Sequence, residues 1–141
     1  MILRCRDQEL ASLLGGEGVG LVFFADPDVS DRWEDVLTEL AEAFSLTKAA
    51  ASQGEPIVYV VAGDDLLGRD GIGAAMVATA LLSGARTASL ELKKSTVNTL
   101  AVEKGSSPES IATWVRHLLT VDGPRGELVR LGGAHLGKAL P

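Results

Sequence analysis

The sequence predicts an α/β domain built on a parallel β-sheet, and three observations support this class. Short apolar runs alternate with longer amphipathic runs along the chain, which is the pattern of strand–helix–strand units. The short runs are almost wholly apolar, as expected of strands in a parallel sheet. The length of 141 residues, 46% of them hydrophobic, suffices for one domain with its own core. We therefore expect a single domain over residues 1–141, with about five strands and four helices in two or three layers.

The first two strands and the helix between them are placed by apolar and turn residues. Met1 to Cys5 and Val19 to Ala25 are the two apolar runs. The short helix begins at Asp7, a favourable capping residue, and ends at Gly15 and Gly16. Its expected inward side chains are Leu10, Leu13 and Leu14.

A second helix is predicted from an apolar stripe with helical spacing. Ser30 or Asp31 is expected to cap it. The stripe consists of Trp33, Val36, Leu37, Leu40 and Phe44. The opposite, solvent-facing side is expected to carry Glu34, Asp35, Glu39 and Glu42.

The remaining elements follow in the same alternating order. Pro56 opens a third strand through Val61, and the glycine-rich stretch 63–71 leads into a helix that reaches about Lys94. Val97 to Val102 is the fourth strand, and Glu127 to Leu131 is the fifth. Between them Ser107 and Pro108 begin a helix. Its expected inward side chains are Ile111, Trp114, Val115, Leu118 and Leu119.

The composition excludes several classes of function. The net charge is −6, from 13 basic and 19 acidic residues without a basic block, which argues against binding to nucleic acid or an anionic membrane. The longest uncharged stretch, 71–85, is shorter than the ~20 residues of a spanning helix. The single cysteine, Cys5, excludes an internal disulfide framework. We expect a cytoplasmic protein, because no export signal begins the sequence.

Several strings recur in the order and spacing of a known family. They are 20–26 (GLVFFAD), 30–37 (SDRWEDVL), 44–50 (FSLTKAA), 81–92 (LLSGARTASLEL), 97–100 (VNTL), 108–112 (PESIA) and 126–133 (GELVRLGG). Together they resemble the second half of the short-chain dehydrogenases/reductases. This resemblance implies a Rossmann-related sheet that lacks the first βαβ unit, and hence a truncated, degenerate relative without the cofactor-binding amino-terminal part.

The resemblance also shows which catalytic residues are replaced. The family uses a Tyr, a Lys four residues later, a Ser and a helical Asn. Ala74 stands at the Tyr position and Ala78 at the Lys position. The Ser position falls on Val61 or Ala62, and the Asn position on Glu39 or Leu40. Alanine carries neither a dissociable proton nor a charge, so the resemblance implies no catalytic residues and no hydride transfer.

Neither glycine-rich segment has the form of a dinucleotide loop, and we expect no cofactor. Residues 15–20 precede a strand instead of following one. Residues 68–73 do follow a strand and open a helix, so they could hold an anion. However, the whole loop, 63–71, is long for a dinucleotide turn. Asp64, Asp65 and Asp70 would also repel a phosphate unless Arg69 compensates.

Other candidate sites have simpler structural interpretations. His117 and His135 lack Cys or carboxylate partners at metal-binding spacing, so we predict no metal site. Asp26, Asp28 and Asp31 could bind a divalent ion, but capping of a helix N-terminus is the preferred interpretation. Tyr59 lies on a strand and is expected in the core. Cys5, also on a strand, is expected to be buried and inert.

Topology adds an expectation about what covers the sheet. Without a reversal, the strand order is 1-2-3-4-5, and right-handed crossovers would place every helix on one face. The other sheet face would then be apolar and open, so something else must cover it.

These observations predict an assembly protein. The helix over 72–92 is apolar around most of its circumference, so one side should pack on a partner. In the resembled family this helix and the preceding one form a four-helix dimer bundle. The residues that would permit close approach are Gly73, Ala75, Ala80, Gly84 and Ala88. The expected partner is a second copy, or a full-length short-chain dehydrogenase/reductase.

The alternative uses the loops at the carboxyl ends of the strands. A small-molecule or nucleotide-phosphate binding domain, or an enzyme of different chemistry, would bring polar groups together there. The candidate residues for such a site are Asp26, Asp64, Asp65 and Arg69.

Overall fold

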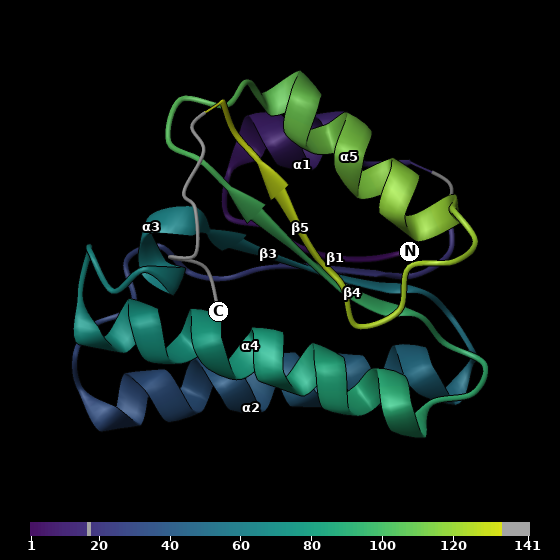
Figure 1. The fold of residues 1–141 in the computed structure, drawn as a ribbon, viewed down its shortest axis with the longest axis horizontal. Coiled ribbons are helices and arrows are strands. Elements are labelled where there is room, and N and C mark those ends of the chain that lie inside the picture. The colour runs from purple at the N-terminus through teal and green to yellow at the C-terminus, as the bar shows by residue number, and fades with distance from the viewer. Residues whose placement is uncertain (17, 134–141) are drawn as a thin grey trace.

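The computed structural model describes residues 1–16 and 18–133, which form one five-stranded sheet (Figure 1). The strands are β1 (Ile2–Arg4), β2 (Leu21–Phe24), β3 (Ile57–Ala62), β4 (Val97–Val102) and β5 (Leu128–Leu131). All neighbouring strands are parallel, and their spatial order is β1-β2-β3-β4-β5. The predicted α/β class, the five strands and the unreversed order are confirmed.

The helices include one that the sequence did not predict. They are α1 (Gln8–Leu14), α2 (Trp33–Ser52), α3 (Gly63–Leu66), α4 (Ile72–Glu91) and α5 (Pro108–Thr120). The additional helix, α3, lies within the glycine-rich stretch after β3. Its four residues are too few to show a helical period, which is why the segment was predicted to be a loop.

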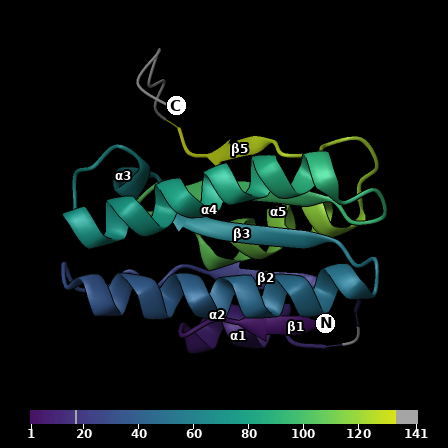
Figure 2. The ribbon, with the colours of Figure 1, turned by 90° about the horizontal axis from the view of Figure 1, so that it is seen from below.

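Helices cover both faces of the sheet, so the expectation of one covered face is wrong. α1 and α5 pack together on one face, and α2 and α4 on the other (Figures 1 and 2). Because every crossover steps in the same direction, the crossovers on opposite faces must have opposite hands, and two of the four depart from the usual handedness. Both faces of the strands are apolar, so burial of the second face stabilises this arrangement.

The two faces of the sheet form two separate cores. Val22, Val58 and Leu100 point towards α1 and α5. Phe23 and Tyr59 point towards α2 and α4, with their rings edge to face at 6.4 Å. The Tyr59 hydroxyl hydrogen-bonds Thr47 Oγ1 at 2.6 Å, and burial raises its pKa. Tyr59 is therefore buried in the core, as predicted.

The face that α2 turns to the sheet differs from the predicted stripe. Trp33, Leu37 and Phe44 are exposed, whereas Glu39 is only 5% exposed. The buried side chains of α2 are Val36, Glu39, Ala43 and Ala50. Small alanines let the helix approach the sheet closely, and Glu39 tolerates burial because it pairs with Arg4. In α5, Trp114 is likewise exposed rather than inward.

Candidate functional site

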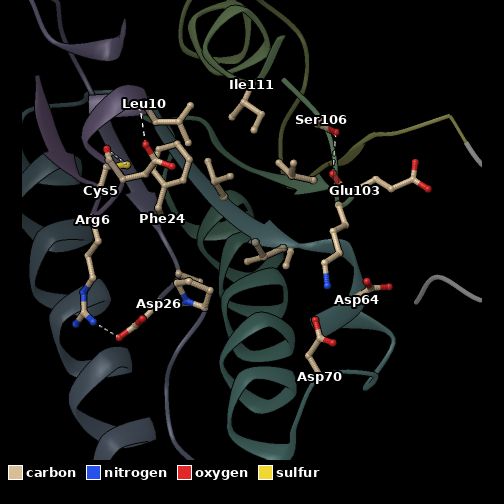
Figure 3. A pocket seen from close by; sticks show the side chains of 18 of the residues that line it. Cys5, Arg6, Leu10, Phe24, Asp26, Asp64, Asp70, Glu103, Ser106 and Ile111 are labelled. Atoms are coloured by element: carbon tan, nitrogen blue, oxygen red, sulfur yellow. Dashed lines mark hydrogen bonds and ion pairs between the residues drawn. The ribbon is translucent and has the colours of Figure 1, made fainter. Parts of the chain in front are cut away.

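A cleft of about 490 Å³ opens at the carboxyl ends of β1 to β4 (Figure 3). The carboxyl ends of parallel strands meet at one sheet edge, so the loops that follow them surround the same space. One wall is apolar and is formed by Leu10, Phe24, Val60, Val102 and Ile111. The rim carries ionisable groups, among them Arg6, Asp26, Asp64, Asp70 and Lys104.

Asp26 follows β2 and is held firmly at this rim. Its carboxylate pairs with Arg6 at 2.5 Å and accepts the backbone N–H of Asp28 at 3.0 Å. Its own backbone N–H donates to the Glu39 carboxylate at 2.8 Å. Within residues 1–16 and 18–133, no group of three or more His, Cys, Asp or Glu residues is arranged to hold a metal ion.

A largely buried ion pair positions this part of the cleft. Arg4 donates to Glu39 at 2.5 Å and to the carbonyl oxygen of Phe24 at 2.7 Å, and its guanidinium lies 4.8 Å from the centroid of the Phe23 ring. Glu39 thereby links β1 to the loop after β2. The sequence analysis missed this pair and placed Glu39 on the solvent side. The available signal was its position three residues after Val36 and four before Ala43, both of which face the sheet.

The four residues predicted for a ligand loop are only partly brought together. Asp26 and Asp64 both line the cleft. Arg69 pairs with Asp64 at 3.0 Å but lines a separate groove beside α4. Asp65 is 5% exposed on α3 and does not line the cleft. Burial, followed by repulsion from Asp70 and Asp64, raises the pKa of Asp65.

Arg6 and Lys104 at the rim were missed by the sequence analysis, which considered Asp70 only as a residue that would repel a phosphate. Arg6 and Lys104 lie two residues beyond the ends of β1 and β4, and Asp70 lies in the segment before α4. Position at the carboxyl end of a parallel strand was the signal that could have found Arg6 and Lys104.

The helix N-termini near the cleft do not fit a pyrophosphate. The carboxylate of Asp7 accepts the first free N–H groups of α1, at 2.9 and 3.0 Å. At α4 the carboxylate of Asp31 accepts the Gly73 N–H at 2.8 Å, and a Cβ on Gly73 would overlap the backbone of Ser30. Three backbone N–H groups at these two N-termini therefore already have carboxylate acceptors, whose negative charge would repel a phosphate.

The same contacts correct the predicted cap of α2. Its N-cap is Arg32, which makes no capping hydrogen bond through its side chain. Asp31 instead caps α4, 42 residues further along the chain. Ser30 accepts the N–H of Arg32 at 3.1 Å and donates to Asp35 at 2.5 Å.

The positions that align with the family's catalytic residues lie in different parts of the fold. Val61 and Ala62 line the cleft. Ala74 and Ala78 point into the core from α4, and neither has a polar side chain. Glu39 is engaged by Arg4 and by the N–H of Asp26.

The remaining candidate residues are Cys5, His117 and His135. Cys5 lines the cleft and is half-buried, not fully buried as expected. Burial raises the pKa of its thiol, which disfavours the reactive thiolate. His117 is exposed on α5 and contacts Trp114 edge to face at 5.7 Å. His135 lies outside the described residues.

The outer face of α2 and α4 has a different character from the cleft. Its exposed large apolar side chains are Trp33, Leu37, Phe44, Ile72, Met76 and Leu90. A groove of about 480 Å³ lies between the two helices, and Ala80, Gly84 and Ala88 line it. Ala75 lines a second groove on the amino-terminal half of α4. Gly73, by contrast, packs against the chain's own loop at Ser30. No helix in the described part of the chain is long and apolar enough to cross a membrane.

The chain is similar to known proteins at the level of the fold. No protein-family model and no curated protein matches it. A short-chain dehydrogenase/reductase, glucose/ribitol dehydrogenase, from Brucella melitensis has a TM-score of 0.65 at 21% identity, over 79% of this chain and 61% of its own. A citronellol catabolism dehydrogenase from Pseudomonas aeruginosa has a TM-score of 0.60 at 19% identity, over 80% of this chain and 60% of its own.

A third structure, a protein from Listeria innocua, has a TM-score of 0.61 at 13% identity and covers 83% of this chain and 73% of its own. The fold is therefore that of a Rossmann-like α/β protein. In particular it matches the fold of short-chain dehydrogenases/reductases over part of their length, as the sequence resemblance implied. The chain spans 61% of the length of the Brucella structure and 60% of the Pseudomonas one.

Proposed function

We propose that this chain is a non-catalytic relative of the short-chain dehydrogenases/reductases that acts as an assembly subunit. It associates through the outer face of α2 and α4, either with a second copy or with a catalytic protein of the same fold. The observation that carries this proposal is the concentration of exposed apolar side chains on that face, with a groove between the helices.

The charge distribution on α4 supports association. Arg86 and Glu91 are the only charged residues among its 20. A helix whose outer side faces only water usually carries several charges there, whereas an interface core is depleted of them. Burial of Leu90, which is 88% exposed, would by itself remove a large apolar side chain from water.

The non-catalytic part of the proposal rests on side-chain chemistry. Ala74 and Ala78 supply neither the proton donor nor the cation of the family's mechanism, and both are buried. At the N-termini of α1 and α4, the carboxylates of Asp7 and Asp31 accept backbone N–H groups, and their negative charge would repel a phosphate there. Both features argue against hydride transfer between a dinucleotide and a carbonyl.

The test is the solution mass of the purified protein, measured by light scattering, alone and after co-expression with a catalytic dehydrogenase of this fold. We expect a dimer or a stable heteromer that Phe44→Glu dissociates, because a buried charge opposes association. Trp114→Glu, a matched change on the opposite face, should leave the mass unchanged. A monomer under both conditions would contradict assembly. Tight nicotinamide-dinucleotide binding or alcohol oxidation by the isolated chain would contradict the non-catalytic assignment.

Small-molecule binding is a second candidate function, and the cleft is the observation that favours it. An apolar wall and ionisable rim groups face one cavity of about 490 Å³, which is within the size range of ligand sites. The cleft lies at the strand ends, away from the outer face of α2 and α4, so that ligand binding and assembly need not compete.

A further inference from the structure

We propose that the outer face of α2 and α4 binds a second copy of this chain, with the amino ends of the two helices over the carboxyl ends of the same helices in the other copy. This inference rests on the proposed assembly function and assigns to it one partner and one orientation. It follows from the common direction of the two helices, from the charges at their ends, and from the positions of large and small side chains along them.

The two helices run in the same direction, so their outer face has one amino end and one carboxyl end. Each helix connects two parallel strands, β2 to β3 for α2 and β3 to β4 for α4. At the amino end, the Gly73 N–H donates to the Asp31 carboxylate at 2.8 Å. At the carboxyl end, Gly54 lies beside the side chain of Lys94. Figure 2 shows α2 and α4 alongside each other between these two contacts.

The amino end of this face carries a net negative charge. This end comprises residues 28–37 and 69–78, which include the first turns of α2 and α4. Its charged side chains are all exposed, and five are acidic whereas two are basic, which gives a formal charge of −3. They are Asp28, Asp31, Glu34, Asp35, Asp70, Arg32 and Arg69.

The carboxyl end, residues 43–52 and 85–94, carries a net positive charge. Its charged side chains are also exposed, and four are basic whereas one is acidic, which gives a formal charge of +3. They are Lys48, Arg86, Lys93, Lys94 and Glu91. The helix dipoles offset only part of these charges, because each helix contributes about half a charge of the opposite sign at each end. A net charge of about two therefore remains at each end, negative at the amino end and positive at the carboxyl end.

These opposite charges select the orientation of a second copy. A two-fold axis perpendicular to the helices places the amino end of each copy over the carboxyl end of the other, so that unlike charges meet twice. An axis parallel to the helices would place like ends together, and Coulomb repulsion opposes that arrangement. The charges therefore favour antiparallel association.

The large and small side chains are also unevenly distributed along the face. Four of the six exposed large apolar side chains lie in the amino-terminal halves of the helices, namely Trp33, Leu37, Ile72 and Met76. Most residues that line the groove lie in the carboxyl-terminal halves, among them Ala51, Gly84 and Ala88. The perpendicular axis lays the apolar side chains of each copy over the groove of the other. A second copy supplies both parts of this contact, so shape and charge favour the same partner and the same orientation.

The experiment reverses the charge at one end of the face at a time, in the whole chain. The amino-end variant carries Glu34→Lys and Asp70→Lys, and the carboxyl-end variant carries Lys93→Glu and Lys94→Glu. The dissociation constant of each dimer is measured by sedimentation equilibrium at low and high salt. Circular dichroism checks that each variant is folded.

The matched control changes charge in the other helical layer. Glu9→Lys with Glu109→Lys alters the net charge as much as the amino-end variant does, and both residues are exposed in the first turns of α1 and α5. This control should dimerise as the unmodified chain does.

We expect the unmodified chain to dimerise, and each end variant to raise the dissociation constant about tenfold at low salt, because like charges then meet twice. The difference should shrink at high salt, which screens the charges. When the two variants are mixed in equal amounts, native mass spectrometry should detect mainly the heterodimer. Each variant then meets the charge that its own reversed end requires.

The outcomes separate this inference from the proposed function. A chain that is monomeric alone but binds a catalytic protein of the same fold would overturn the second copy and leave assembly in place. Dimerisation that Phe44→Glu abolishes but neither end variant weakens would overturn the orientation alone. A dimer that survives Phe44→Glu, or a chain that is monomeric under all conditions, would overturn this inference together with assembly through this face.

Discussion

The two helical layers bury the same sheet but present different surfaces to solvent. α5 exposes Trp114 as its large apolar side chain, among polar neighbours such as Arg116 and His117. The layer of α2 and α4 exposes six such side chains, and small residues such as Ala80 and Gly84 are among those that line the groove between its helices. Each layer buries one face of the sheet. The difference lies in the surfaces that the layers turn to solvent, and it is the observation on which the proposed association rests.

The largest expected effect is on the attachment of α2 to the sheet. Glu39→Ala would leave Arg4, whose side chain is 11% exposed, without its nearest carboxylate. We expect the free energy of unfolding in urea to fall by about 3–5 kcal/mol, the usual result of removing one partner of a buried pair. The matched variant Glu42→Ala removes a half-exposed partner and should change stability by less than about 1 kcal/mol. Equal losses would mean that Glu42 contributes as much as Glu39 to holding Arg4.

The two cores can be compared directly by truncating one leucine in each. Leu100→Ala opens a cavity under α1 and α5, and Leu82→Ala opens one under α2 and α4. Each should lower the free energy of unfolding by about 2–5 kcal/mol, since both side chains are almost fully buried. A loss below about 1 kcal/mol on either side would mean that the core on that side is not closely packed.

Two glycines in α4 should respond in opposite directions to the same change. Gly73→Ala would overlap the backbone of Ser30 and should destabilise the protein by about 1–3 kcal/mol. A Cβ on Gly84 has nothing within 4 Å, so Gly84→Ala should stabilise the monomer by about 0.5–1 kcal/mol. Thermal unfolding at low protein concentration measures both. Stabilisation by Gly73→Ala would mean that the loop at Ser30 is not held against α4.

The smallest effect concerns the pH dependence contributed by Asp65. Its pKa is raised in the folded state, so the folded protein binds a proton more readily than the unfolded chain does. Ionisation of Asp65 therefore destabilises the fold at neutral pH, and this loss disappears as the pH falls below the ordinary carboxyl value of about 3.9. Asp65→Asn should raise the free energy of unfolding at pH 7 and have no effect near pH 3. A gain that is independent of pH would exclude this cause.

The sequence predicted the strands better than the helix faces. Val97–Val102 was placed without error, because an apolar run between polar segments needs only local information. The orientation of α2 was not predicted, since large apolar residues at helical spacing were assigned to the core when alanines and Glu39 occupy it. Coverage of both sheet faces was also missed, because a handedness preference is weaker than the requirement to bury a second apolar face.

The candidate site was predicted in part for a similar reason. Asp26 and Asp64 follow strands, and parallel topology alone brings them to one cleft. The buried Arg4–Glu39 pair and the capping of α4 by Asp31 join residues 35 and 42 positions apart. Such contacts depend on how the elements pack, and no local pattern in a single sequence encodes them.

The hydrogen bond from Gly73 to Asp31 has a consequence for recognition. It joins the loop that enters α2 to the first turn of α4, so the two helices are held together at one end by a contact within the chain. A surface already arranged in its bound form loses less conformational entropy on association than one that must be ordered by the partner. If α2 and α4 form the proposed interface, the carboxylate of Asp31 that accepts the Gly73 N–H also preorganises the helix pair for association.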